Sequence, residues 1–553
     1  MRRANKRLAL FMGLALVFLA ALLGRTFYVQ VIAAPSLKGQ ADIQSTRTIT
    51  LDAPRGAIYD RDGEQLAISQ SMATVYANPK QVKDPAAAAH LLAPLVGRSE
   101  EDLLAKLTED SGFEYLSRKI DPAKGDEVKA LKIPGVGVCS EDKRVYPCGA
   151  LAPQLLGYVG MDNDKGLAGV EYEYNDLLKG EPGKLTVVSD LHGNRLDTTS
   201  LHESSPGEPL TLTVDKDIQF EVERILTDVV AGFKAKKACA VVLDPNTGEI
   251  LALANTPVFD TNGYGSREEK DRRNSVVVDM YEPGSTFKMV PVAAALEAGL
   301  VTPSTTFTLG KQIELYDRVV HEAEENIPEV RELTVTQILA HSSNVGAITL
   351  GREVGQERLV EMVEKFGFTE KLDIDFPGEA PGLMPAPEEW SGTTILNIPI
   401  GQGISVTPLQ LAAAYSAIAN DGVLVQPHLR LDGKAPWSRR VVSETVAAQL
   451  RTMLLAVTAE DGTGTNAQVA GYEVAGKTGT AQKVKENGVG YDKNRFIASF
   501  VGMVPASAPR LVILVMVDEP TTEHLGARVA APAFAKIADF ALKSLGIPPT
   551  SLD

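Results

Sequence analysis

Ser285 and Lys288 are the first pair of side chains whose types and spacing could do chemistry. They lie in the stretch 282–288, Glu-Pro-Gly-Ser-Thr-Phe-Lys, where Pro-Gly marks a turn and the residues that follow favour a helix. Side chains three residues apart on a helix share a face, so the lysine would lie beside the hydroxyl. A serine hydroxyl needs a neighbouring base, and a lysine is that base only if burial or a second cation lowers its pKa. The same spacing recurs at Ser140 and Lys143, so the pair alone is weak evidence.

Two later stretches supply groups that could complete such a site. His341-Ser342-Ser343-Asn344 offers a hydroxyl and an amide within a tight loop. Gly476-Lys477-Thr478-Gly479-Thr480 offers a cation, two hydroxyls and a glycine that admits a ligand close to the backbone. Taken singly, such residues are usually caps, turn residues, strand formers or solvated charges. Ser-x-Asn and Lys-Thr-Gly each occur once, and the separate interpretations would require three independent coincidences, so we reject them.

The three motifs form a coherent chemical set. Lys477 would hold Lys288 partly neutral through like-charge repulsion and would draw in a substrate carboxylate. Ser342 could relay a proton towards a leaving amine, and Asn344 could orient the Lys288 ammonium and a substrate amide. The hydrogen-bond donors for a terminal carboxylate would be Thr478 and Thr480.

The order of these motifs, Ser-x-x-Lys, Ser-x-Asn and Lys-Thr-Gly, is that of serine β-lactamases and penicillin-binding proteins. The chain resembles the class B penicillin-binding proteins, which are monofunctional peptidoglycan D,D-transpeptidases. Ser-x-Asn, rather than Ser-x-Asp, makes it most similar to the division-specific FtsI type. Family-like segments cover nearly the whole chain: 22–25, 55–63, 166–171, 401–408 and 495–502.

The resemblance implies a substrate and a mechanism. Ser285 would attack the D-Ala-D-Ala end of a peptidoglycan stem peptide, the last D-Ala would leave, and an amine from a neighbouring strand would close the cross-link. The oxyanion hole would use the backbone N–H groups of Ser285 and Thr480, next to Gly479. β-Lactams would acylate the same serine. No cofactor and no metal would be needed.

Two other activity classes remain as alternatives. A D,D-carboxypeptidase or β-lactamase would need a means to activate water on the acyl-enzyme, and a membrane-tethered chain with a large N-terminal domain fits wall assembly better. A non-catalytic β-lactam sensor would normally carry a cytoplasmic output domain, whereas about seven residues precede the apolar run. Transpeptidation is the leading prediction.

Length and composition bound the class of protein. A chain of 553 residues should form about two or three domains, and its 44% hydrophobic content is too low for a polytopic membrane protein. A formal charge of −16 argues against a nucleic-acid partner, because phosphates would repel it. Seven scattered histidines contain no His-Glu-x-x-His pattern, so a metal site has little support.

An apolar run from Leu8 to Gly24 follows four basic residues, and residues up to Ile32 can complete a membrane span. The positive-inside rule puts residues 1–7 in the cytoplasm and the rest of the chain outside. The resemblance places the protein in the bacterial inner (cytoplasmic) membrane as a single-pass protein. A cleaved signal peptide is the alternative, because small residues follow Ile32, but Arg25 before that point counts against cleavage.

We expect an α+β protein of the penicillin-binding, serine transpeptidase fold, in which helices flank an antiparallel sheet. Residues 8–32 would form the transmembrane anchor, 33–210 a mixed N-terminal pedestal (dimerisation-type) domain, and 211–553 the transpeptidase domain. The segment from about 180 to 209, rich in Gly, Ser, Pro and charge, is predicted to be a hinge. The apolar run 512–517 is predicted to be a central strand, and the Lys477 stretch an edge strand.

Further expectations concern partners and single residues. By resemblance, the partners would be a polytopic lipid II polymerase of the FtsW type at the anchor helix and division proteins at the pedestal. Cys139 and Cys148 could pair outside the cytoplasm or remain free and mostly buried, whereas Cys239 is predicted to be a core residue. An ion network of Arg55, Asp60 and Arg61 is predicted to fix a turn.

Overall fold

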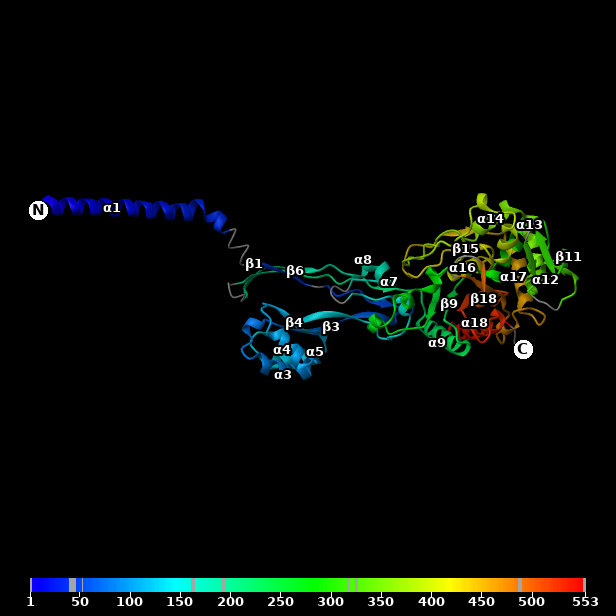
Figure 1. The fold of residues 1–553 in the computed structure, drawn as a ribbon, viewed down its shortest axis with the longest axis horizontal. Helices are drawn as coiled ribbons and strands as arrows, with labels where there is room; N and C mark the ends of the chain where they lie inside the picture. The colour runs from blue at the N-terminus through cyan, green and yellow to red at the C-terminus, as the bar shows by residue number, and fades with distance from the viewer. Residues whose placement is uncertain are drawn as a thin grey trace. The chain divides into compact units, whose positions relative to one another are not determined.

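The structure is a computed structural model that describes residues 2–38, 46–51, 53–160, 165–189, 195–315, 318–323, 327–485 and 490–550 (Figure 1). The chain divides into two compact units. The smaller unit contains Met1–Arg55, Met72–Asp142 and Lys179–Gly207, and the larger contains Gly56–Ser71, Lys143–Leu178 and Glu208–Asp553. Two segments that precede residue 210 therefore group with the larger unit.

The chain begins with a long apolar helix. Helix α1 spans Arg2–Phe27 and continues as a π-helical turn at Tyr28–Ile32. The helical segment of 31 residues has a window of mean hydropathy 2.2, so it is long and apolar enough to cross a membrane. The Arg25 guanidinium lies over the Tyr28 ring, 5.7 Å from its centre. This helix confirms the predicted apolar span.

Beyond α1, the smaller unit contains a group of helices that packs against strands. These helices are α3 (Pro85–Val96), α4 (Glu100–Leu107) and α5 (Pro122–Ala130). They pack around a core that includes Leu92, Leu103, Leu107, Leu116 and Val128. The neighbouring strands are β3 (Gln65–Ala77), β4 (Glu114–Ile120) and β5 (Val136–Val145).

The predicted hinge between about 180 and 209 is wrong. Strands β6 (Gly183–Ser189) and β7 (Arg195–His202) occupy much of this segment and pair antiparallel with each other, while β6 also pairs with β1 (Thr46–Leu51). Residues 190–194, between the strands, lie outside the described part of the chain. The segment contains several Thr and Val residues, which favour strands and outweigh its Gly, Ser and Pro.

A five-stranded antiparallel sheet organises the larger unit. Its strand order is β10 (Ile250–Thr256), β9 (Lys237–Leu243), β19 (Leu511–Asp518), β18 (Tyr491–Val504) and β17 (Ala475–Val484). The apolar run 512–517 lies on the central strand β19, and the Lys477 stretch lies on the edge strand β17. Both strand predictions are confirmed.

Helices cover both faces of this sheet, because every side of its inner strands is apolar. Along β9, Val241 and Leu243 pack into one core, whereas Ala240 and Val242 pack into the other. Successive side chains of a strand point to opposite faces, so both faces must be covered. Helices α9 (Lys216–Phe233) and α18 (Gly526–Ser544) cover the face of Ala240 (Figure 1).

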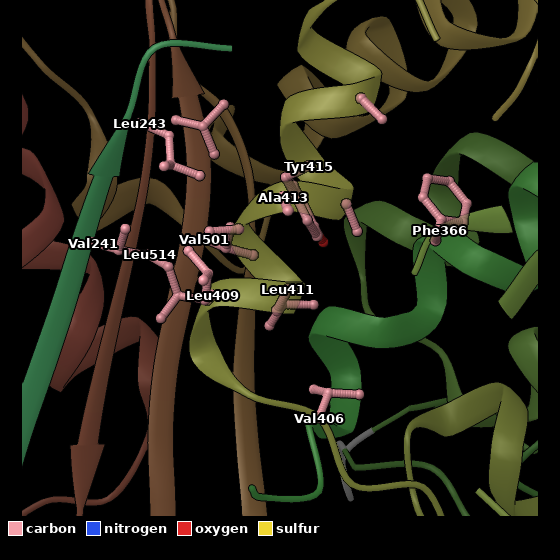
Figure 2. Close-up of a cluster of buried hydrophobic side chains, with 14 of the residues drawn as sticks. Val241, Leu243, Phe366, Val406, Leu409, Leu411, Ala413, Tyr415, Val501 and Leu514 are labelled. Atoms are coloured by element: carbon pink, nitrogen blue, oxygen red, sulfur yellow. The ribbon is translucent and has the colours of Figure 1, made fainter. Parts of the chain in front are cut away.

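The helix α16 (Pro408–Ala419) covers the other face and is buried on all sides. In Figure 2 its side chains Leu409, Leu411 and Ala413 lie between the sheet residues Val501 and Leu514 and the helical layer that contains Phe366. A helix that is apolar all round belongs in the interior of a large core. A capping box of Thr407 and Gln410 begins it. α16 thus lies between the sheet and the neighbouring helices.

The three cysteines of the chain are free thiols. Cys139 and Cys148 are exposed free thiols, so neither the disulfide nor a mostly buried pair is found, and Cys239 lies in the core as predicted.

The Asp60 carboxylate accepts hydrogen bonds from the backbone N–H groups of Asp62, Glu64 and Lys216. Arg61 pairs with Glu249 at 3.1 Å. Asp60 therefore stabilises a turn through backbone hydrogen bonds.

Candidate active site

Ser285 lies on a tight turn at the start of a buried helix. Residues Gly284–Lys288 form a single 3₁₀ turn, and helix α11 (Met289–Glu297) continues from it. Gly284 adopts a left-handed φ of 57° and its N–H donates to the carbonyl of Gly401 at 3.0 Å. A Cβ on Gly401 would lie 2.2 Å from the carbonyl oxygen of Gly284, so this close contact requires glycine.

Two further contacts fix the backbone around Ser285. The hydroxyl of Tyr415, on the buried helix α16, donates to the carbonyl of Thr286 at 2.8 Å. The Thr286 hydroxyl donates to the carbonyl of Pro283 at 2.8 Å. Ser285 itself is only half-buried, in contrast with its buried neighbours. These two hydrogen bonds therefore fix the turn, and Ser285 remains partly accessible.

Lys288 connects the first motif with the second. Its side chain is fully buried, and Nζ donates to Asn344 Oδ1 at 2.7 Å, to Ser342 Oγ at 3.3 Å and to the carbonyl of Ser342. Burial lowers the pKa of Lys288 to about 7, although the negative charge of Glu322 opposes the shift. Near neutral pH this amine is therefore neutral in a large share of molecules, as a general base requires.

The Ser342 loop joins two helices end to end. Helix α12 (Val335–Ala340) stops just before it and α13 (Asn344–Val354) begins at Asn344, with Ser343 as the N-cap that accepts the N–H of Gly346 at 2.9 Å. Ser342 has a φ of 56°, a left-handed conformation that a non-glycine residue adopts only when its surroundings enforce it. This conformation accompanies the contact of both its carbonyl and its hydroxyl with Lys288.

Lys477 lies on the edge strand β17, opposite Val501 of β18, and is also fully buried. Its Nζ contacts the carbonyl of Thr478 at 3.3 Å and the Thr478 hydroxyl at 3.4 Å. Burial lowers the pKa of Lys477 well below its usual range, and the positive charge of Lys288 lowers it further. We predicted that Lys477 holds Lys288 neutral, but the cause that lowers the pKa of Lys288 is burial.

The residues after Lys477 hold the strand against its neighbours. Thr478 Oγ1 contacts Thr463 Oγ1 at 3.2 Å, and Thr480 Oγ1 accepts the N–H of Gly526 at 3.0 Å. A Cβ on Gly479 would lie 2.4 Å from Ser499 Oγ and 2.9 Å from Thr286 Cγ2. We predicted that this glycine admits a ligand, and the structure shows that it lets the turn of Ser285 pack onto the strand.

One cleft of about 1070 Å³ collects residues of all three motifs. Ser285, Ser342, Thr478 and Thr480 line it. Lys288 is joined to this lining, because its Nζ donates to Ser342 Oγ and to Asn344 Oδ1. A separate apolar cavity of about 460 Å³ along α9 contains none of these residues, so its chemistry is unrelated.

Several residues that line the cleft carry no sequence signal that we recognised. Glu322 directly follows the strand Arg318–His321, and Arg331 lies on the strand Val330–Thr334. Glu460, Asp461 and Thr463 come from the loop after α17 (Glu444–Thr458). None of them belongs to a spaced pattern, and only the fold brings them to the cleft. No cluster of histidine, cysteine or acidic residues that could hold a metal ion exists among the described residues.

Comparisons with known proteins agree along the whole chain. The family model "Penicillin binding protein transpeptidase domain" matches residues 238–539, and "Penicillin-binding Protein dimerisation domain" matches residues 50–212. The chain is 36% identical to the probable peptidoglycan D,D-transpeptidase PenA of Neisseria meningitidis, over 99% of this chain and 94% of PenA. It is 34% identical to the peptidoglycan D,D-transpeptidase FtsI of Escherichia coli K12, over 99% of this chain and 93% of FtsI.

A solved structure gives the same result. The crystal structure of penicillin-binding protein 3 from Mycobacterium tuberculosis, complexed with aztreonam, has a TM-score of 0.72 and 31% sequence identity. The match covers 91% of this chain and 98% of that chain. Sequence and structure comparisons therefore agree over both predicted domains.

Proposed function

This chain belongs to the class B penicillin-binding proteins, and from that premise we propose how its residues carry out peptidoglycan D,D-transpeptidation and where in the cell they do so. The family membership makes it a serine-type acyltransferase of cell-wall synthesis. The roles of individual residues, the septal assignment and the partners are our proposals.

The first half-reaction acylates Ser285. Neutral Lys288 takes the hydroxyl proton, and Ser285 Oγ attacks the carbonyl carbon of the penultimate D-Ala. The backbone N–H groups of Ser285 and Thr480 hold the oxyanion, and each such donor typically contributes about 3 kcal/mol. The C–N bond breaks as Ser342 passes the proton from Lys288 to the leaving amine, and free D-Ala departs.

The second half-reaction transfers the acyl group to an amine. An amino group of a neighbouring stem peptide attacks the ester carbonyl and gives up its proton through the same path in reverse. The bond between the acyl carbon and Ser285 Oγ breaks, Oγ takes up that proton and becomes the free hydroxyl again, and the cross-link is an amide. Lys477, Thr478 and Thr480 bind the terminal carboxylate of the donor peptide. β-Lactams react at Ser285 by the first half-reaction.

The observation that carries this proposal is the environment of Lys288. It is buried, it has a lowered pKa of about 7, and its Nζ lies against the hydroxyl and amide of the second motif. A structural lysine would instead be paired with a carboxylate or reach solvent. This environment supports a proton-exchanging role beside a serine nucleophile.

The direct test combines mass spectrometry with a product assay. Full-length protein is labelled with penicillin and digested, and the adduct is expected on Ser285. The protein is then given a D-Ala-D-Ala donor and an acceptor amine, and cross-linked product is expected. Release of D-Ala without cross-linking would favour the hydrolase, and stable penicillin binding without either product would favour the sensor.

The cellular setting completes the proposal. The helix at residues 8–32 anchors the protein in the bacterial inner membrane with residues 1–7 in the cytoplasm and the catalytic domain outside. Residues 33–210 form the pedestal and 211–553 the transpeptidase domain. The Ser342-x-Asn344 motif and the relative named FtsI support a role in septal synthesis. A polytopic lipid II polymerase at the anchor and division proteins at the pedestal are the proposed partners.

A further inference from the structure

We propose that Glu322 is a positioning residue that holds the Ser342–Asn344 loop against Lys288 and, through its charge, sets the pH range in which Ser285 is acylated. The inference rests on the proposed acylation of Ser285 by way of Lys288. Glu322 follows the strand β13 (Arg318–His321) and lines the active-site cleft, and its side chain is 3% exposed.

Both carboxylate oxygens of Glu322 bind the loop. The hydroxyl of Ser343 donates to Oε1, and the backbone N–H of Asn344 donates to Oε2 at 2.6 Å. His321, the residue before Glu322, adds a third bond, because its carbonyl accepts from Asn344 Nδ2 at 2.9 Å. The amide of Asn344 is thus fixed at its nitrogen end, and its oxygen end is directed towards Lys288.

These bonds explain how the strained loop keeps its shape. Ser342, with its left-handed φ of 56°, lies directly before the two residues that Glu322 binds. The carbonyl and hydroxyl of Ser342 are the other acceptors for Lys288 Nζ. A strained conformation persists only where the surroundings over-determine it. Removal of the carboxylate would let the loop relax and would take its acceptors away from Lys288.

The charge of Glu322 acts on Lys288 without direct contact. Its negative charge favours the protonated amine, in opposition to burial. The other titratable or charged groups in these surroundings include Lys477 on β17, whose pKa is lowered by burial and by the charge of Lys288, and Arg331 on β14 (Val330–Thr334), whose Nη2 donates to Glu322 Oε1 at 3.0 Å. His341, Glu460 and Asp461 also line the cleft. Loss of the Glu322 charge would remove the negative charge that raises the pKa of Lys288 and would favour the neutral amine.

Three substitutions separate geometry from charge. Glu322→Gln removes the charge, yet its amide can accept from Asn344 N–H and donate to the Ser343 hydroxyl. Glu322→Asp keeps the charge but is one methylene too short for both bonds. Glu322→Ala loses both. The matched control is Glu332→Gln, which removes an exposed carboxylate on the neighbouring strand.

The measurement is the rate of acylation by a fluorescent penicillin across the pH range, with full-length protein in detergent. For Glu322→Gln the acid-side midpoint should move to lower pH by roughly one unit, with the high-pH rate close to wild type. Glu322→Asp should keep the midpoint and lose rate, and Glu322→Ala should lose about tenfold or more of the high-pH rate. Glu332→Gln should match the wild type.

Each contrary result overturns a defined part of the inference. An unchanged midpoint in Glu322→Gln, with its melting temperature retained, would overturn the charge effect. A wild-type rate in Glu322→Ala would overturn the positioning role. If the wild-type protein were labelled somewhere other than Ser285, the proposed function would fail instead, so the two failures are distinguishable.

Discussion

The two lysines of the motifs, Lys288 and Lys477, are equally buried but lie in different surroundings. Lys288 has three acceptors within hydrogen-bond distance of Nζ and the charge of Glu322 nearby, and its pKa is lowered to about 7. Among the described residues, Lys477 Nζ makes hydrogen-bond contacts with the carbonyl and hydroxyl of its neighbour Thr478, and burial and the charge of Lys288 lower its pKa well below the usual range. Burial disfavours the protonated form of both lysines. The three hydrogen-bond acceptors and the charge of Glu322 distinguish the surroundings of Lys288 from those of Lys477.

This difference assigns the two lysines different tasks. An amine whose pKa lies near the working pH can both accept and return a proton, as a general base must. An amine whose pKa is lowered by burial takes up a proton more readily when an anion approaches, because an opposite charge raises its pKa. Lys288 is therefore suited to the serine hydroxyl and Lys477 to the substrate carboxylate.

The comparison presupposes that Ser285 is the group that Lys288 serves. Ser285→Ala should abolish covalent penicillin labelling and leave the thermal melting temperature near wild type, because the side chain is small and half-buried. Gel fluorescence after penicillin labelling measures the first, and circular dichroism the second. The matched control is Ser140→Ala, which alters the other Ser-x-x-Lys sequence and should label normally. Residual labelling of Ser285→Ala at the wild-type rate would exclude Ser285 as the nucleophile.

Loss of the base should be the next largest effect. Lys288→Met replaces the lysine with an unbranched apolar side chain of similar length that cannot act as a base. Acylation should therefore slow by about 10²–10⁴-fold. The same variant should unfold at higher temperature near pH 7. Because the folded-state pKa lies below that of the unfolded chain, the wild type loses stability as the pH falls from about 10 towards 7. If the wild type and Lys288→Met had equal melting temperatures at about pH 7 and at about pH 10, burial of a titrating amine would be contradicted.

Loss of the carboxylate-binding lysine should cost less. Lys477→Met should lower acylation by about 10–10²-fold, since attraction of the carboxylate is lost while the base remains. Its rate should also depend less on salt than that of the wild type. Stopped-flow measurements at several ionic strengths test both statements. A loss as large as that of Lys288→Met, with the acid-side midpoint abolished, would mean that the two tasks have been assigned the wrong way round.

The smallest effect concerns the contact between the strand of Lys477 and the turn of Ser285. Gly479→Ala places a Cβ against Ser499 and Thr286 and should destabilise the protein by about 1–3 kcal/mol. Gly232→Ala is the matched control, because nothing lies within 4 Å of its added Cβ and alanine favours the helix. Chemical denaturation measures both. A neutral Gly479→Ala would show that the strand can move away from the turn without cost.

Local patterns predicted the elements but not the surroundings of the lysines. The run 512–517 was identifiable as a central strand because both of its faces are buried, and the three motifs marked the cleft because each has a distinctive spacing. The burial of Lys288 depends on the packing of α11, α13 and the sheet, which no single segment encodes. Glu322 reaches Asn344 only because β13 ends beside the loop, so a sequence separation of 22 residues concealed it.

The central claim is that Lys288 exchanges the serine proton with a pKa near 7, and the pH dependence of acylation tests it most directly. The rate constant for penicillin acylation of the wild-type protein should fall on the acid side with a midpoint at about 7. That acid limb should be absent from the residual rate of Lys288→Met. A wild-type rate that is constant from about pH 5 to pH 9 would contradict the claim.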